Sequence, residues 1–265
     1  MIVSVCSHKG GTGKTTSSLS LAVAFSQQGK KVLLVDLDPQ ANLSYSIDLV
    51  DISRDISHLF TGEATFEDVV HESFGISVIP ASERLADVEF SLQSAEDRGF
   101  FLKEILGSKM NEYDVVLLDC PPSRSLLTVN ALVCSDFAVT PVLLDVLSIQ
   151  GLLFMTRTIL DIRKTYNPRL TFLGVIAVNV DLRKNISKEV LTVFKEQIDY
   201  PIFETMVRTN TKLAEAPSHG LPIQFYQPKS SAASDYTQLA EEIWNNMMTY
   251  GIREKVKAGQ AHSAH

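Results

Sequence analysis

The sequence predicts an α/β fold with three layers, in which a doubly wound, mostly parallel sheet lies between helices. Short runs rich in Val, Ile and Leu alternate with helical patterns, and no repeat, low-complexity stretch or flexible linker interrupts this order. Nearly continuous apolar runs are typical of parallel strands that are covered on both faces. Right-handed crossovers between such strands place helices on both sides of the sheet.

The expected elements follow one another along the chain. Each expected strand is a short apolar run, and these runs are 2–7, 32–36, 76–80, 115–119, 137–142 and 172–180. Each expected helix lies between or after these runs, at about 15–28, 95–109, 125–133, 149–164, 187–197 and 233–250. We expect a single domain over residues 1–250 and a polar, frayed C-terminal tail over residues 251–265.

Composition narrows the class of protein. With 265 residues, of which 45% are hydrophobic, the chain can fill a sizeable core. It contains no apolar run long enough to span a membrane, and its first strand leads directly into a glycine-rich loop, unlike a signal peptide. We therefore expect a cytoplasmic protein.

The three cysteines, Cys6, Cys120 and Cys134, lack CxxC spacing, which favours buried free thiols.

The charge of the chain is uneven. A net charge of −7 argues against a protein that coats nucleic acid with its whole surface. Residues 157–229, however, contain 11 Lys or Arg against 7 Asp or Glu, whereas the remainder contains 13 against 24. The sequence therefore allows a localised basic face.

A glycine-rich loop between the first strand and the first helix carries the strongest chemical signal. Glycines let the backbone aim successive N–H groups at phosphate oxygens, and the helix N-terminus adds partial positive charge. We expect Lys14 to reach the β- and γ-phosphates of a nucleotide and Thr15 to bind Mg²⁺. The nucleotide-binding residues expected in this P-loop are Lys9, Gly10, Gly11, Thr12, Gly13, Lys14, Thr15 and Thr16.

Carboxylates follow two other expected strands. Asp36 ends the second strand, Asp38 lies two residues further, and Asp119 ends a buried run. Because a buried Asp is costly unless it is paired or near a cation, we expect Asp119 to coordinate Mg²⁺ through water. We expect Asp36 to support the Mg²⁺ shell, and Asp38 to face the γ-phosphate and orient the attacking water. The alternative is that Asp36 and Asp38 only cap a turn.

These segments resemble the deviant Walker A superfamily, which includes ParA, MinD and the nitrogenase iron proteins. The loop KGGTGKTT is similar to its Walker A motif, DLDPQAN to its switch I, and YDVVLLDCPPS to its Walker B strand and switch II. Further stretches resemble chromosomal Soj-type ParA proteins, namely SLLTVNAL, AEAPSHG and YQPKSSAASDY. The resemblance thus spans nearly the whole chain.

The resemblance implies a Mg²⁺-dependent ATPase whose slow hydrolysis of ATP to ADP and phosphate is stimulated by a partner. In this superfamily, the lysine at the position of Lys9 crosses the interface of an ATP-sandwich homodimer and neutralises phosphate charge on the other subunit's nucleotide. Lys9, Lys14 and Asp38 are therefore implied as catalytic residues. The surroundings of Cys120 do not resemble the cluster ligand loops of the nitrogenase iron proteins.

The same resemblance implies contacts to the adenine and to DNA. Pro228, Lys229 and Ser230 correspond to a segment near the adenine, and Asn179 to a position where some relatives bind the base; a core-edge role for Asn179 is the alternative. The DNA-binding residues implied are Arg183, Lys184, Arg208 and Lys212. The chain departs from the Soj pattern here, because it has Arg208-Thr209 where Soj-like chains usually have proline-arginine. A simple solvated basic face is the alternative.

The function implied is a partition ATPase. It would dimerise on ATP binding, bind double-stranded DNA nonspecifically, and segregate a plasmid or chromosome with a ParB-like activator, so that the ATP-bound form associates with the nucleoid. One alternative is a MinD-like membrane-associated ATPase, although residues 251–265 supply only Ile252 and Val256 as large aliphatic residues. Another is a ParA-like ATPase that positions a protein cargo, such as a carboxysome or chemoreceptor cluster. The last alternative function is that of a metabolic kinase or synthetase of related fold.

Overall fold

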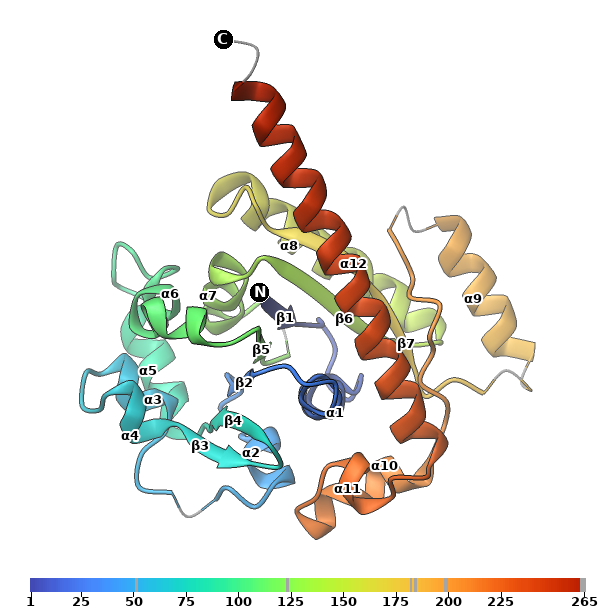
Figure 1. Cartoon of the computed structure of the whole chain (residues 1–265), viewed down its shortest axis with the longest axis horizontal. Helices are drawn as coiled ribbons and strands as arrows, with labels where there is room; N and C mark the ends of the chain where they lie inside the picture. Colours follow the sequence, from blue (N-terminus) through green and yellow to red (C-terminus); the bar gives the residue numbers. More distant parts are fainter. Residues whose placement is uncertain (51, 123, 182, 184, 198–199, 263–265) are drawn as a thin grey trace.

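Seven strands form one sheet at the centre of the computed structural model, in the order β3-β4-β2-β5-β1-β6-β7 (Figure 1). The structure describes residues 1–262 except 51, 123, 182, 184, 198 and 199. Neighbouring strands pair in parallel, and the antiparallel pair β3/β4 lies at one edge. The strands are β1 Ile2–Val5, β2 Val32–Asp36, β3 His71–Ser73, β4 Ile76–Ile79, β5 Val115–Asp119, β6 Phe137–Leu143 and β7 Thr171–Val178. The predicted fold class is confirmed.

Helices connect the strands and cover both faces of the sheet (Figure 1). The longer ones are α1 Lys14–Gln27, α5 Arg84–Leu92, α6 Phe101–Leu106, α7 Leu126–Cys134, α8 Val146–Thr165, α9 Asn185–Gln197 and α12 Ser231–His262. The shorter ones are α2 Asn42–Ser46, α3 Ile56–Phe60, α4 Phe66–Val69, α10 Thr211–Glu215 and α11 Ile223–Tyr226, with 3₁₀ turns at η1 Gly107–Glu112 and η2 Ala216–His219.

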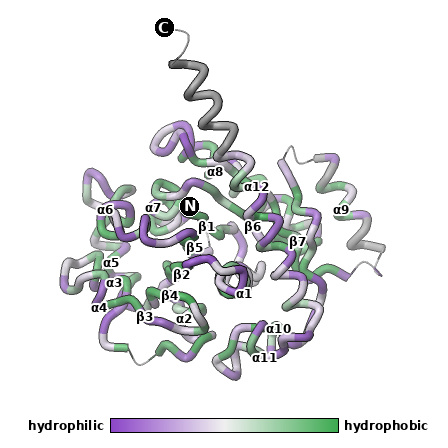
Figure 2. The backbone as a smooth tube through the Cα atoms, in the orientation of Figure 1, coloured by the Kyte–Doolittle hydropathy of each residue, from purple (hydrophilic) through white to green (hydrophobic). Residues whose placement is uncertain are grey.

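Alternate residues of the central strands pack into different cores. Val115 and Leu117 of β5 pack with residues of α1 and α12, whereas Val116 and Leu118 pack with α5, α6, α7 and α8. This follows from the two-residue period of a strand. The central strands are accordingly among the hydrophobic parts of the chain in Figure 2.

Two of the predicted helices differ from the observed ones. The helix expected at 95–109 is wrong in its first half: α5 ends at Leu92, and α6 begins only at Phe101. The side chain of Asn130 on α7 explains the interruption, since its Oδ1 accepts from Leu102 N and its Nδ2 donates to Arg98 O. The last helix was expected to end at 250, but α12 continues to His262, into the stretch that we expected to be a frayed tail.

The ends of the parallel strands gather the candidate site at one edge of the sheet. Asp36 at the end of β2 is the register partner of Asp119 at the end of β5, and Val5 at the end of β1 is the partner of Asp119 on its other side. The glycine-rich loop follows β1 directly. Three segments far apart in the sequence therefore meet at the carboxyl edge, where ligands of α/β proteins bind.

The cysteines behave as predicted. Cys6, Cys120 and Cys134 are all buried and free. Burial raises the pKa of the Cys6 and Cys134 thiols to about 12, so these groups are neutral packing residues.

None of the helices in the described ranges is both long and apolar enough to cross a lipid bilayer.

Candidate nucleotide-binding site

The loop after β1 exposes backbone N–H groups and holds one lysine inside its curve. Gly11 and Gly13 have φ of 73° and 76°, a left-handed conformation that favours glycine. Gly13 precedes α1 and offers no side-chain cap to its first turn, so these N–H groups remain available to an anion. Lys14 is buried, and its Nζ lies 3.5 Å from the carbonyl oxygen of Lys9.

Two hydroxyls hold the base of this loop. The Oγ of Ser7 lies 2.6 Å from the Oγ1 of Thr12, and Ser7 Oγ donates to the carbonyl oxygen of Lys9 at 2.9 Å. Both side chains are buried. These contacts among the loop's own residues hold its curved shape, which lowers the ordering cost of ligand binding.

Asp119 is the centre of the hydroxyl contacts at the start of α1. Its Oδ2 accepts from Thr15 Oγ1 at 2.8 Å, and its Oδ1 accepts from Ser18 Oγ at 2.7 Å. Burial raises the pKa of this carboxyl. When Thr15 donates its proton to Asp119, the lone pairs of its hydroxyl oxygen remain free to coordinate a cation.

The neighbouring carboxyls fit a divalent cation. Burial and the adjacent Asp119 carboxylate raise the pKa of Asp36, whose side chain is fully buried. A cation held between these groups and bound phosphates would favour their charged forms. Hydroxyl and carboxylate oxygens, here from Thr15 and Asp119, are ligands that suit Mg²⁺. The oxygens of both Asp36 and Asp119 already accept hydrogen bonds, so both carboxyls suit contact with the cation through water, with Asp36 in the supporting role.

Asp36 ties together the two ends of the loop that carries Asp38. Its Oδ1 accepts from Asp38 N at 3.1 Å, and its Oδ2 accepts from Ser44 N at 3.1 Å and Ser44 Oγ at 2.8 Å. Asp38 is buried, and its Oδ1 accepts from Gln40 N at 3.0 Å. The turn at Asp38 therefore exists, as the turn-capping alternative requires, but it lies at the carboxyl edge beside the P-loop.

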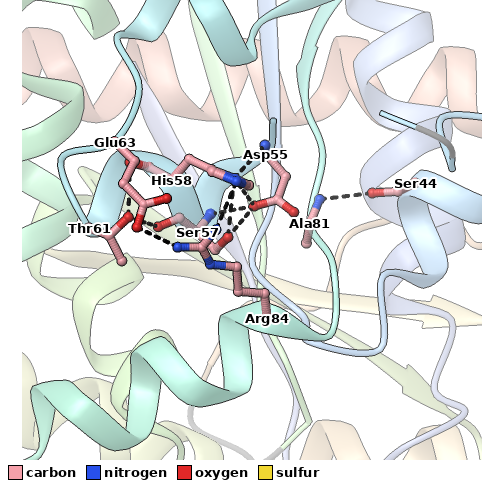
Figure 3. A network of polar contacts seen from close by, with 8 residues as sticks. All are labelled: Ser44, Asp55, Ser57, His58, Thr61, Glu63, Ala81 and Arg84. Atoms are coloured by element: carbon pink, nitrogen blue, oxygen red, sulfur yellow. Dashed lines mark hydrogen bonds and ion pairs between the residues drawn. The ribbon is translucent and has the colours of Figure 1, made fainter. Parts of the chain in front are cut away.

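Ser44 joins this loop to the end of a further strand. Its Oγ, besides donating to Asp36, accepts from Ala81 N at 3.0 Å, two residues after the end of β4 (Figure 3). Figure 3 also shows the adjacent polar cluster around His58, in which Arg84 binds the imidazole Nε2 at 2.9 Å and pairs with Glu63. The buried Ser44 hydroxyl thus connects the ends of β2 and β4 through hydrogen bonds to Asp36 and Ala81.

Replacing Ser44 with alanine is expected to lower kcat by about 10- to 100-fold with little change in KM, because the loop would no longer hold Asp38 in place. The buried amide of Ala81 would also lose its acceptor, which should cost about 1–3 kcal/mol of unfolding free energy. Steady-state ATPase assays and urea unfolding measure both effects. Ser44→Thr keeps the hydroxyl and should recover kcat; an unchanged kcat in Ser44→Ala would contradict the positioning role.

Lys9 contacts its own chain. Its Nζ lies 3.8 Å from Asp145 Oδ2, and both side chains are about two-fifths exposed. The other oxygen of Asp145 accepts from Ser148 N at 2.8 Å and so caps α8. An exposed pair of this kind contributes only about 0–1 kcal/mol, so Lys9 can exchange Asp145 for another anion at small cost.

Known proteins are similar to this chain over most of its length. Residues 1–172 match the AAA domain family. The sporulation initiation inhibitor protein Soj of Bacillus subtilis is 35% identical over 249 residues, which cover 92% of this chain and 98% of Soj. The chromosome-partitioning ATPase Soj of Thermus thermophilus is 36% identical, covering 91% of this chain and 94% of its own length. ParA of Caulobacter vibrioides is 33% identical, covering 91% and 93%.

The chain belongs to the Soj/ParA family of P-loop ATPases. Among solved structures, cobyrinic acid a,c-diamide synthase from Mycobacterium smegmatis with bound ADP and magnesium has a TM-score of 0.80 and 28% identity, covering 91% of this chain and 92% of that chain. MinD from Pyrococcus horikoshii in complex with Mg-ADP has a TM-score of 0.75 and 25% identity, covering 91% and 95%. The resemblance to this superfamily predicted from the motifs is confirmed.

The adenine contacts implied by the Soj/ParA resemblance fall in two places. Asn179 directly follows β7 and has a φ of 56°. The residue before it, Val178, packs close to the P-loop: a Cβ added at Gly13 would lie 3.6 Å from its side chain. The end of β7 therefore borders the P-loop. Pro228, in contrast, lines a surface pocket with Gln27, at the opposite end of α1 from the P-loop. Lys229 is exposed, and Ser230 Oγ accepts from Ala233 N at the start of α12. Adenine binding by residues 228–230 remains a prediction.

The cations expected to bind DNA already have carboxylate partners. The Nε and Nη2 of Arg183 donate to Asp181, and Lys212 Nζ donates to Glu215 at 2.7 Å. Lys184 lies outside the described residues. Arg208 is bound most firmly: its Nε, its Nη2 and its backbone N all donate to the carboxylate of Asp235, which is buried. Removing Arg208 from this pair would leave a buried charge unpaired.

Several residues of this site were missed by sequence reasoning. A local signal exists for two of them: Ser18 lies one helical turn after Lys14, and Asp145 is a typical N-cap residue before α8. Ser7 at the base of the loop and Ser44 on α2, just after switch I, have no such signal. Their roles depend on contacts with residues on other segments of the fold or further along a loop.

Proposed function

We propose that the chain is an ATP-dependent partition ATPase that works as a homodimer, binds double-stranded DNA nonspecifically and segregates a plasmid or chromosome with a ParB-like activator. The observation that carries the proposal is Lys9, a partly exposed lysine in the P-loop whose ion pair with Asp145 is weak. Two of the relatives named above, at 36% and 33% identity, are named as chromosome-partitioning proteins, and both identities exceed the 28% of the synthase structure.

The residues of this chain would share the work of hydrolysis. The amides of residues 10–15 and the Lys14 ammonium bind the phosphates of ATP. Thr15 and, through water, Asp119 would hold Mg²⁺, which when bound would neutralise charge on the phosphate oxygens. Asp38, fixed through Asp36 and Ser44, orients the attacking water.

DNA binding would depend on cations that can leave their carboxylates. Lys212 and Glu215 form an exposed ion pair, which contributes little to stability, so a phosphate can replace the carboxylate. The Arg183 side chain is 90% exposed and can reach a phosphate, although its partner Asp181 is only 15% exposed. Arg208 is 56% exposed but is held by the buried Asp235, so we expect it to contribute less to DNA binding. We therefore expect Arg183 and Lys212 to contribute to a basic face, with the ATP-bound form associated with the nucleoid.

A gel-shift on random-sequence DNA tests this proposal. We expect a shift with ATP and Mg²⁺, and none with ADP or without nucleotide. Arg183→Ala and Lys212→Ala should each reduce the salt slope of log K by about one, because each removes one phosphate contact. Lys103→Ala, on α6, is the matched control and should leave the slope unchanged. Equal DNA binding in all three nucleotide conditions would contradict the proposal.

A further inference from the structure

One helix carries an unusual share of the exposed apolar side chains. Ten large apolar side chains are strongly exposed in the described part of the chain, and four of them, Leu147, Leu153, Phe154 and Leu160, lie on α8. Leu147 is 66% exposed and Phe154 40%. They lie seven residues apart, which is about two helical turns, so both belong to one row on the outer face of α8. Exposed apolar rows on otherwise well-packed helices mark interaction surfaces.

This row begins beside the P-loop. The rings of Phe154 and His8 have centroids 4.0 Å apart, and a Cβ at Gly151, between the two apolar residues, would lie 3.9 Å from His8 Cβ. This part of α8 therefore lies against His8, the residue next to Lys9. The apolar row and the nucleotide-binding edge form one continuous surface.

The charges on this surface fit a second copy of the same chain. Lys9 and Asp145 stand at the same end of the row, both partly exposed, and the pair between them is weak. A surface that carries an apolar row beside one cation and one anion is self-complementary under a two-fold axis, because each charge can meet its opposite on the partner.

We infer that Leu147 and Phe154 form the apolar seam of the ATP-dependent dimer, where they pack against a second copy of α8. This inference rests on the proposed function, which requires Lys9 to lie in the interface. Packing along α8 would bring each Lys9 toward the opposite subunit and release it from Asp145. In this dimer the apolar side chains of the seam would be buried against the second copy, and Lys9 would contact the negative charge of the nucleotide bound to that copy.

The test compares charged substitutions in an Asp38→Ala protein, in which hydrolysis is blocked, by light scattering with ATP and Mg²⁺. Leu147→Asp should weaken dimerisation at least about tenfold without unfolding the protein, because an acidic residue in the first turn of a helix is favourable. Phe154→Asp should act in the same direction. Phe90→Asp is the matched control: Phe90 is 76% exposed on α5, and the dimer should be unaffected.

The outcomes separate the seam from the proposed function. If Asp38→Ala forms a dimer that Leu147→Asp leaves intact, the seam inference is wrong and the proposed dimer stands. If Asp38→Ala never dimerises, both fail. Binding of a fluorescent ATP analogue should be equal in Leu147→Asp and its parent, which shows that the site itself is intact. Loss of binding to anionic phospholipid vesicles in Leu147→Asp, with dimerisation unchanged, would assign the row to lipid and overturn the inference.

Discussion

Lys14→Ala is expected to weaken ATP binding by more than about 100-fold. Lys14 is buried within the curve of the P-loop, where its Nζ lies 3.5 Å from the Lys9 carbonyl oxygen and its charge acts on the nearby Asp119 carboxylate. Charged hydrogen bonds contribute about 1.5–3 kcal/mol each, and we expect Lys14 to contact two phosphates. Titration with a fluorescent ATP analogue measures the loss.

The matched control for this prediction is the other lysine of the loop. Lys9→Ala removes a cation five residues away that is exposed and directed at Asp145, so the isolated chain should keep its affinity for the analogue within a few-fold. An unaltered affinity in Lys14→Ala would show that the loop does not bind nucleotide in the manner described. An equal loss in both variants would contradict the different roles assigned to the two lysines.

Asp38→Ala is expected to reduce kcat by about 100- to 10,000-fold while nucleotide binding is retained. The structure places Asp38 two residues after the end of β2, in a loop that Asp36 closes through Ser44. Its removal takes away the group that orients water but leaves the P-loop and Asp119 untouched. Single-turnover hydrolysis of radiolabelled ATP measures the chemical step separately from product release.

Asp38→Asn is the matched variant for this prediction. It keeps the size of the side chain and an oxygen that can accept from Gln40 N, so the turn should persist. It removes the negative charge, so hydrolysis should remain slow. Turnover close to the unmodified rate in both variants would assign Asp38 to the turn alone, in agreement with the turn-capping alternative.

The arrangement of the site at the strand ends could be predicted from the sequence. Asp36 and Asp119 each end an apolar run, and the carboxyl ends of parallel strands share one edge, so their proximity follows from the fold class. The P-loop could likewise be predicted from the spacing of residues within its motif, because the motif itself contains Gly11 and Gly13, which adopt the left-handed conformations of the loop. Signals confined to a few consecutive residues were sufficient for these parts.

Contacts between distant segments could not be predicted. Arg208 looks like a free cation in the sequence, but its partner Asp235 lies 27 residues further along, on α12. The break between α5 and α6 depends on Asn130, which lies about 30 residues away. A single sequence gives the chemistry of such side chains but not their partners, because packing decides which segments meet.

The central claim is that two copies of the chain share ATP, each lending Lys9 to the other. It is tested most directly by the mass of Asp38→Ala in solution, measured by light scattering with Mg²⁺ and either ATP or ADP. We predict twice the 29.3 kDa mass of the chain with ATP, the monomer mass with ADP, and the monomer mass with ATP once Lys9→Ala is added. A monomer with saturating ATP, or a dimer that is indifferent to Lys9, would contradict the account.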